Sequence, residues 1–175
     1  MDKPLNVVVL IGARSDPEQL FRSALGEATP ATALSRAAGR EVLVSLLSLL
    51  PSAADLGLAT PHIVSPPRTP WLDRLLAKLP LNRLESLLRT SPAGRLLLSL
   101  GPTDPSRVFW RSVRADPAAV ALLASADVLL AADLPAVRTA WHFLREGKVP
   151  AAYFGLQAAE KVFAARYGSS RPLAG

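Results

Sequence analysis

The chain has 175 residues, of which 50% are hydrophobic and 19% are charged, and its mean hydropathy is +0.25. This composition is typical of a folded globular domain and excludes a disordered chain. The absence of cysteine excludes disulfides, thiolate metal sites and a cysteine nucleophile, and it agrees with a cytoplasmic location. No apolar run approaches the roughly 18 residues that a membrane span requires.

The net charge of +6 is concentrated in one part of the chain. Nine basic and three acidic residues lie between Arg68 and Arg114, whereas the rest of the chain holds equal numbers of both signs. Aromatic residues are not interleaved with these charges, and acids are mixed among them, which argues against nucleic acid as the partner. A specific role for the excess charge should therefore be sought in this segment.

The first third of the chain alternates predicted strands and helices. The strands are apolar runs closed by turn residues, and the helices begin at a capping residue followed by proline or end at glycine. In chain order these are a strand at 5–11, a helix at 17–28, a helix at 31–38, a strand at 42–49, and a short strand or extended loop at 61–65.

Residues 71–100 form the leucine-rich part of the basic segment. Leucines recur at helical spacing with basic residues on the other face, and Pro80 divides the segment into two helices. Such a segment suits an interfacial membrane helix, a partner helix, or packing against the sheet or into a homodimer. The residues predicted to form a membrane or partner surface are Trp71, Arg74, Lys78, Arg83 and Arg89.

The last third returns to alternation. The predicted elements are a strand or helix start at 108–113, a helix from 117 to about 125, a strand at 128–132, a helix from 134 to 147, a strand at 149–154 and a helix at 156–167. Strand–helix–strand units at this spacing predict an α/β fold. We expect it to be Rossmann-like, with a doubly wound, mainly parallel sheet that carries helices on both faces. We expect a single domain over residues 1–168, with 71–100 as a helical insertion and 169–175 as a mobile tail.

The turn after the first strand is a candidate ligand site. Gly12, Arg14 and Ser15 precede a predicted helix, whose free N–H groups could hold an anion. A dinucleotide fingerprint needs three glycines and a P-loop needs Gly-Lys-Ser/Thr, and neither is present. The other interpretation of Gly12 is that the chain needs glycine only to leave the strand. No cofactor is predicted.

Two residues are candidates for catalysis. Asp133 ends a predicted strand, where acids often contact substrates, but it is equally suited to cap the following helix. His62 could act as a general base at a strand end, or it could simply be hydrogen-bonded in place. The two histidines, without cysteine or paired acids at ligand spacing, do not predict a metal site, and no Gly-x-Ser-x-Gly is present to start a hydrolase triad.

A family resemblance begins at Asp127. Residues 127–154 open with Asp-Val-Leu-Leu-Ala-Ala-Asp-Leu-Pro and close with Lys-Val-Pro-Ala-Ala-Tyr-Phe. This segment resembles the N-terminal half of two-domain (GT-B) retaining glycosyltransferases, where an Asp-Val-Val strand ending in His-Asp leads to a helix and a Val-Pro-Val-Val strand. Asn6–Gly12 and Arg40–Leu46 fit the first two strands of that half, so the resemblance covers about half of the chain. The family has a histidine where this chain has Ala132.

The resemblance implies an activity that needs a second domain, because in that family the nucleotide-sugar site is built mostly by the other half. It also implies membrane docking, because some members attach through a basic, leucine-rich patch on this half. The leading hypothesis is a glycosyltransferase-like domain that acts with a second domain or subunit and presents an acceptor- or membrane-facing surface. We expect this domain in the cytoplasm or peripherally on the inner face of the membrane. A non-catalytic α/β interaction subunit is the second hypothesis, and a small enzyme using His62 and Asp133 together is the third.

Overall fold

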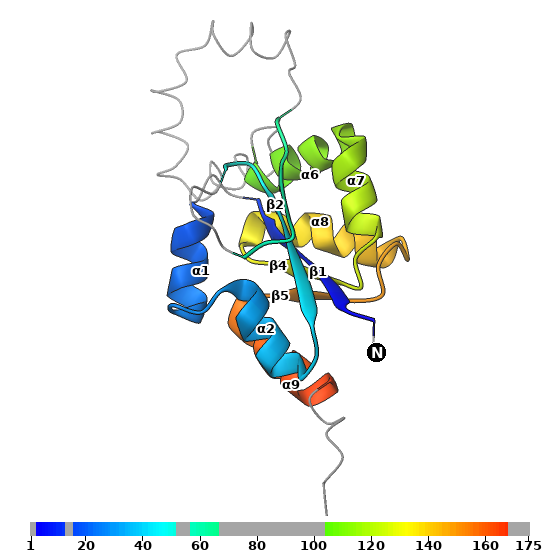
Figure 1. Ribbon diagram of the computed structural model, residues 1–175. Helices are drawn as coiled ribbons and strands as arrows, with labels where there is room; N and C mark the ends of the chain where they lie inside the picture. Colours follow the sequence, from blue (N-terminus) through cyan, green and yellow to red (C-terminus); the bar gives the residue numbers. More distant parts are fainter. Residues whose placement is uncertain (1–2, 13–15, 52–56, 67–103, 168–175) are drawn as a thin grey trace, which may run out of the picture.

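The structure is a computed structural model that describes residues 3–12, 16–51, 57–66 and 104–167 (Figure 1). The predicted helices of 71–100 and the tail 169–175 lie outside these ranges. So do Arg14, Ser15 and the predicted surface residues Trp71, Arg74, Lys78, Arg83 and Arg89.

The described strands form one parallel sheet in the order β3-β2-β1-β4-β5. They are β1 (Leu5–Ile11), β2 (Val42–Ser48), β3 (Thr60–Ile63), β4 (Val128–Ala131) and β5 (Ala152–Phe154). The chain adds strands on one side of β1 as far as β3 and then returns to place β4 on the other side. The strand order therefore reverses between β1 and β4, the position at which open α/β sheets bind ligands.

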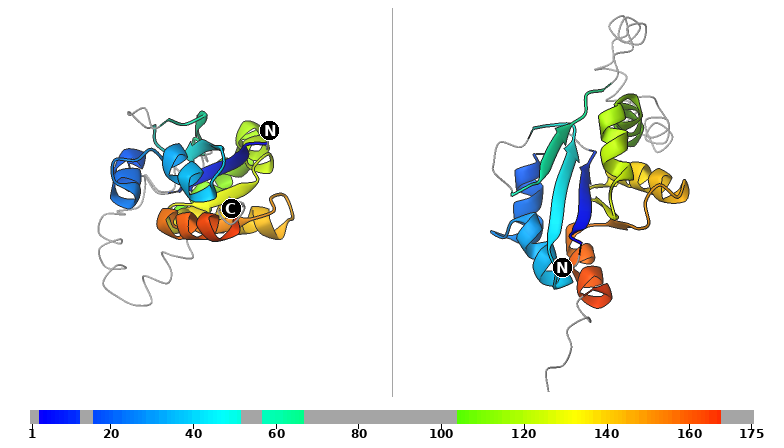
Figure 2. Two further views of the ribbon diagram at one scale, coloured as in Figure 1. Left: turned by 60° about the horizontal axis from the view of Figure 1, so that its bottom comes forward. Right: turned by 45° about the vertical axis from the view of Figure 1, so that its right-hand side comes forward.

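Helices cover both faces of this sheet, as the right-hand view of Figure 2 shows. One face carries α1 (Pro17–Leu25), α2 (Pro30–Ala38) and α9 (Leu156–Arg166), and the other carries α6 (Pro105–Ala115), α7 (Pro117–Ala124) and α8 (Leu134–Arg145). Successive residues of β1 alternate between the two cores, so that Val7 and Val9 pack toward α1, α2 and α9 while Val8 and Leu10 pack toward α6–α8. A strand buried on both faces must be apolar, which explains the sequence of β1 from Val7 to Ile11; the polar Asn6, near its start, is only half-buried.

Local signals set where most helices begin. Five of the six described helices have proline in the first turn and a side-chain cap that accepts a backbone N–H. The capping residues are Asp16, Thr29, Asp104, Asp116 and Asp133. The exception is α9, which follows Gly155 with no side-chain cap.

The α/β prediction with a parallel sheet is confirmed, and the structure corrects several boundaries. Residues 108–113, which fitted a strand or a helix, belong to α6, because Phe109, Ser112 and Val113 are buried at helical spacing. The first helix ends at Gly26, where φ is 67°, earlier than predicted. The last strand begins at Ala152 rather than 149, after Pro150, which has no N–H to donate to the ladder.

Candidate functional site

Asp133 joins the two strands that flank the switch point. Its Oδ1 accepts a hydrogen bond from the amide of Gly12 at 3.0 Å and from the amide of Ala136 at 3.0 Å. The first bond holds the end of β1, and the second caps α8. The capping role predicted for Asp133 is therefore confirmed, and the same carboxylate also fastens β1 to α8.

Gly12 lies against the backbone of α8. A Cβ at this position would be 2.7 Å from the amide nitrogen of Ala136 and 2.8 Å from the carbonyl carbon of Pro135. These distances are too short for any side chain, so only glycine fits without movement of the backbone. The requirement is steric and comes from a helix more than 120 residues further along the chain.

Two backbone donors at this edge of the sheet point at carboxylates of the protein itself. The amide of Gly12 donates to Asp133, and in the first turn of α1 the amide of Glu18 donates to Asp16 at 3.0 Å. An anionic ligand here would meet these two negative charges as well as the helix ends. The ligand-binding role of Gly12 remains a prediction, whereas its close contact with α8 is observed.

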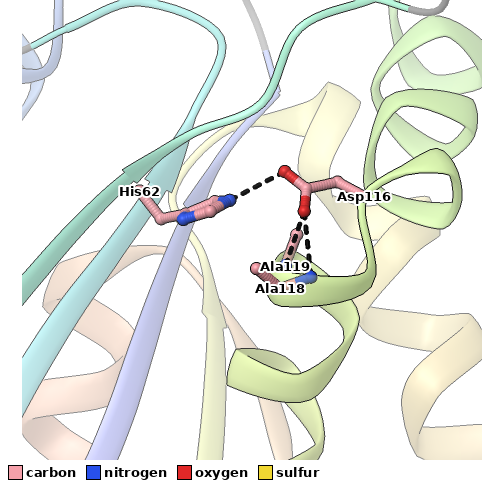
Figure 3. Close-up of polar contacts among 4 residues, drawn as sticks. All are labelled: His62, Asp116, Ala118 and Ala119. Atoms are coloured by element: carbon pink, nitrogen blue, oxygen red, sulfur yellow. Dashed lines mark hydrogen bonds and ion pairs between the residues drawn. The ribbon is translucent and has the colours of Figure 1, made fainter.

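His62 pairs with Asp116, as Figure 3 shows. Its Nε2 lies 2.8 Å from Oδ2 of Asp116, whose Oδ1 accepts from the amides of Ala118 at 2.9 Å and Ala119 at 3.2 Å. The hydrogen bond from His62 is the main reason why the pKa of Asp116 lies below its ordinary value of 3.8. One carboxylate thus caps α7 and holds the edge strand β3 against the helical layer.

An imidazole oriented by a carboxylate is the arrangement that general bases use, but the structure does not bring His62 and Asp133 together. His62, Leu47, Leu10 and Ala131 are successive partners across four strands. Three strand spacings make roughly 14 Å, and Asp133 lies two residues beyond Ala131. No proton can pass directly over this distance, so the small-enzyme hypothesis that joins both groups is not supported.

Metal-ligand clusters and membrane-spanning helices are absent from the described ranges. No three His, Asp or Glu residues there gather as metal ligands, and no helix there is long and apolar enough to cross a membrane. Two depressions are open and shallow, one of about 630 Å³ along α2 and one of about 390 Å³ along α1. Neither is lined by His62, Asp116 or Asp133.

The outward face of α8 carries a stripe of exposed apolar side chains. Leu134 exposes 74% of its surface and Trp141 exposes 48%, although both are large and hydrophobic. We call this feature the α8 outer stripe; it consists of Leu134, Val137, Trp141 and Leu144. Exposed apolar side chains are ordinary when scattered, but four of them on one side of one helix indicate an interaction surface.

The inner face of α8 explains why these residues are outside. Three of the four buried residues there, Ala136, Thr139 and Ala140, are small. The helix packs closely on α6 and on Gly12, so larger side chains have no room against the sheet. The sequence predicted a helix at this position, but not which of its two apolar sides faces the core.

Aromatic and basic side chains border the stripe. The ring of Trp110 in α6 stacks on His142 with centroids 4.4 Å apart, and the guanidinium of Arg145 lies 5.0 Å from the centre of the Trp141 ring. Burial lowers the pKa of His142, and Arg138 lowers it further. The border of the stripe therefore owes its positive charge to arginine.

No family model, curated protein or solved structure matches the chain. The contacts of the switch point, the His62–Asp116 pair and the α8 outer stripe are thus the observations on which a functional proposal depends.

Proposed function

We propose that this chain is a Rossmann-like domain that acts by binding a protein partner, and that the α8 outer stripe is the surface that binds it. The single observation that supports this proposal is the arrangement of α8, which buries small residues and exposes large apolar ones. Full burial of a large apolar side chain contributes about 1.5–3 kcal/mol, and each of the four residues of the stripe, which are 36–74% exposed, offers a part of that energy to a partner.

The edge of β5 extends this apolar surface. Phe154 exposes 51% of its surface and pairs in register with Ala131, which is buried in the core on the α8 side of the sheet. Because residues in register share a face, Phe154 lies on the same side of the sheet as α8. A partner that covers the stripe and this corner could approach the roughly 1,000 Å² that a specific interface needs.

The proposal can be tested by placing a photoreactive amino acid at position 141 of the full chain in living cells. We expect one dominant crosslinked protein, lost when Leu134 and Leu144 are changed to Ser. The matched control is position 161, because Lys161 is exposed on α9 in the opposite layer. The same products from both positions would contradict the proposal.

A glycosyltransferase-like domain is the second candidate, supported by the resemblance of Asp127–Phe154, which spans β4, α8 and β5. In this case the partner would be the second domain or subunit that completes the nucleotide-sugar site. Thermal unfolding with a panel of sugar nucleotides separates the candidates, because a ligand at about 100 times its Kd adds about 2.7 kcal/mol of stability. Reproducible stabilisation by one nucleotide would favour the transferase, and no response would favour the interaction domain.

A further inference from the structure

We infer that the partner of the α8 outer stripe is an amphipathic helix with acidic residues beside its apolar seam. The inference rests on the proposed function and names the chemistry of the partner.

The spacing of the stripe indicates a helix as the binding element. Its members are three, four and three residues apart, which is the a/d spacing of a heptad seam. At 1.5 Å per residue the stripe is about 15 Å long and only one side chain wide. The ridge of a second helix matches these dimensions, and its apolar side chains would fit between those of α8.

The charges beside the stripe are the reason to expect acids on the partner. Arg138 and Arg145 are exposed, seven residues apart and on the same side of the stripe. In a heptad that begins at Leu134 both occupy position e, from which side chains pair with charges on the neighbouring helix. The guanidinium of Arg145 already lies over Trp141, so it is held along the seam. The acid next to it in sequence, Glu146, is paired with Lys148 at 2.7 Å.

A second copy of the chain does not supply the acidic side chains. In an antiparallel pair of α8 helices whose stripes overlap fully, Arg138 would face the same residue of the other copy, and like charges repel. In a parallel pair Arg145 would face the uncharged Ala140. Arg138 would then face Asp133, whose carboxylate already accepts two backbone amides. Residues 67–103 are also unsuited as a source of acids, because they contain six basic and two acidic residues.

A lipid surface fits this face less well than a helix. The buried side of α8 is centred on Ala136 and Phe143. With 3.6 residues per turn, the opposite side is occupied by Leu134, Trp141, Arg138 and Arg145. A membrane that took up this face would receive two guanidinium groups at the deepest point, which is unfavourable. A helix instead contacts the apolar side of the stripe and places its carboxylates over the arginines.

The test is a selection from a display library of helical peptides about 18 residues long. Apolar residues are fixed at positions a and d, and all other positions vary among Glu, Lys, Gln and Ala. The baits are the full chain, a charge-reversed chain with Arg138→Glu and Arg145→Glu, and a control with Arg36→Glu and Lys161→Glu. The control changes the net charge equally, but at exposed positions of α2 and α9 in the opposite layer.

We expect the wild-type and control baits to enrich Glu beside the seam and the reversed bait to enrich Lys. The Kd of the best acidic peptide, measured by fluorescence anisotropy, should rise about tenfold or more for the reversed chain and for Trp141→Ala. It should stay within about twofold for the control.

Peptides that depend on Trp141 but show no excess of Glu would overturn the acidic partner and leave the docking surface in place. A library from which no peptide depends on Trp141 would overturn both.

Two further measurements address the other occupants. Co-sedimentation with phosphatidylserine-containing vesicles that Trp141→Ala abolishes would replace the helix by a membrane, and dimerisation in sedimentation equilibrium that the same change abolishes would replace it by a second copy.

Discussion

Replacing Gly12 by Ala tests whether the end of β1 and the start of α8 are packed as closely as the structure shows. The new Cβ would meet the amide nitrogen of Ala136 at 2.7 Å, whereas ordinary contact begins near 3.4 Å. The strand end and the helix must therefore separate by about 0.7 Å. The atoms in the way are backbone, so no side chain can rotate to relieve the clash.

The separation would also weaken the two hydrogen bonds that Asp133 accepts from the strand and the helix. Overpacking of a tight site costs about 1–3 kcal/mol, and a weakened hydrogen bond adds about 1 kcal/mol. We therefore expect Gly12→Ala to lower the free energy of unfolding by about 2–4 kcal/mol. For a chain of this length each kcal/mol corresponds to a fall in Tm of about 2–4 °C.

The measurement is urea unfolding followed by circular dichroism, with Gly39→Ala as the control. Gly39 has a φ of 64° and nothing within 4 Å of its added Cβ, so only backbone strain of about 1–2 kcal/mol is expected there. The reasoning fails if Gly12→Ala is as stable as the wild type or more stable. If the site around Gly12 were open and unstrained, Ala would instead stabilise the protein, because it restricts the unfolded chain more than Gly does. The sign of the change in the free energy of unfolding therefore distinguishes a tight site from an open one.

Three further predictions follow from single contacts, and a fourth follows from the charge of the central segment. Asp133→Ala should lower stability by about 2–3 kcal/mol because it removes a cap and the bond to Gly12, whereas Asp133→Asn keeps an acceptor and should cost less; denaturant unfolding compares them. The hydrogen bond with His62 lowers the pKa of Asp116 below 3.8 in the folded protein, so the hydrogen bonds that this carboxylate accepts contribute stability that is present above that pH and is lost as the pH falls further. In an acid titration of unfolding, Asp116→Asn should remove this contribution to the pH dependence. Thr139 has a buried hydroxyl without a hydrogen-bond partner among the described residues, so Thr139→Val should raise stability by about 1 kcal/mol in the same assay, and a loss would show that the hydroxyl is satisfied. If the central basic segment docks on membranes, flotation with anionic vesicles should weaken when four of its cations are replaced by Ser, and equal binding would contradict that role. The cations to replace are Arg74, Lys78, Arg83 and Arg89.

The two candidate catalytic residues show how far sequence reasoning reached. The cap formed by Asp133 could be predicted because the carboxylate and its amide, on Ala136, are three residues apart. The partner of His62 could not, because Asp116 is 54 residues away and the contact depends on β3 lying beside the α6–α7 corner. Local contacts can be derived from spacing, whereas contacts between distant elements depend on how those elements pack.

The α8 outer stripe was within reach of the sequence but was not found. Its 3-4-3 spacing is visible in the order of the residues, yet the four residues between and beside them, Ala136, Thr139, Ala140 and Phe143, repeat at helical spacing too. Hydrophobicity alone favours burying the stripe, because its side chains are on the whole larger and more apolar than those of the other four residues. The tight approach of α8 to Gly12 and α6 reverses that choice, and the sequence does not show this approach.

The sequence by itself determined the α/β class, most strand and helix positions and the starts of α1, α7 and α8, because apolar runs, prolines and capping residues act over one to four residues. Only the tertiary structure decided the order of the strands, the second bond of Asp133 and the partner of His62. It also decided which side of α8 meets solvent. These features join residues that are far apart in the chain, and their energies depend on distances between packed elements that no local pattern contains.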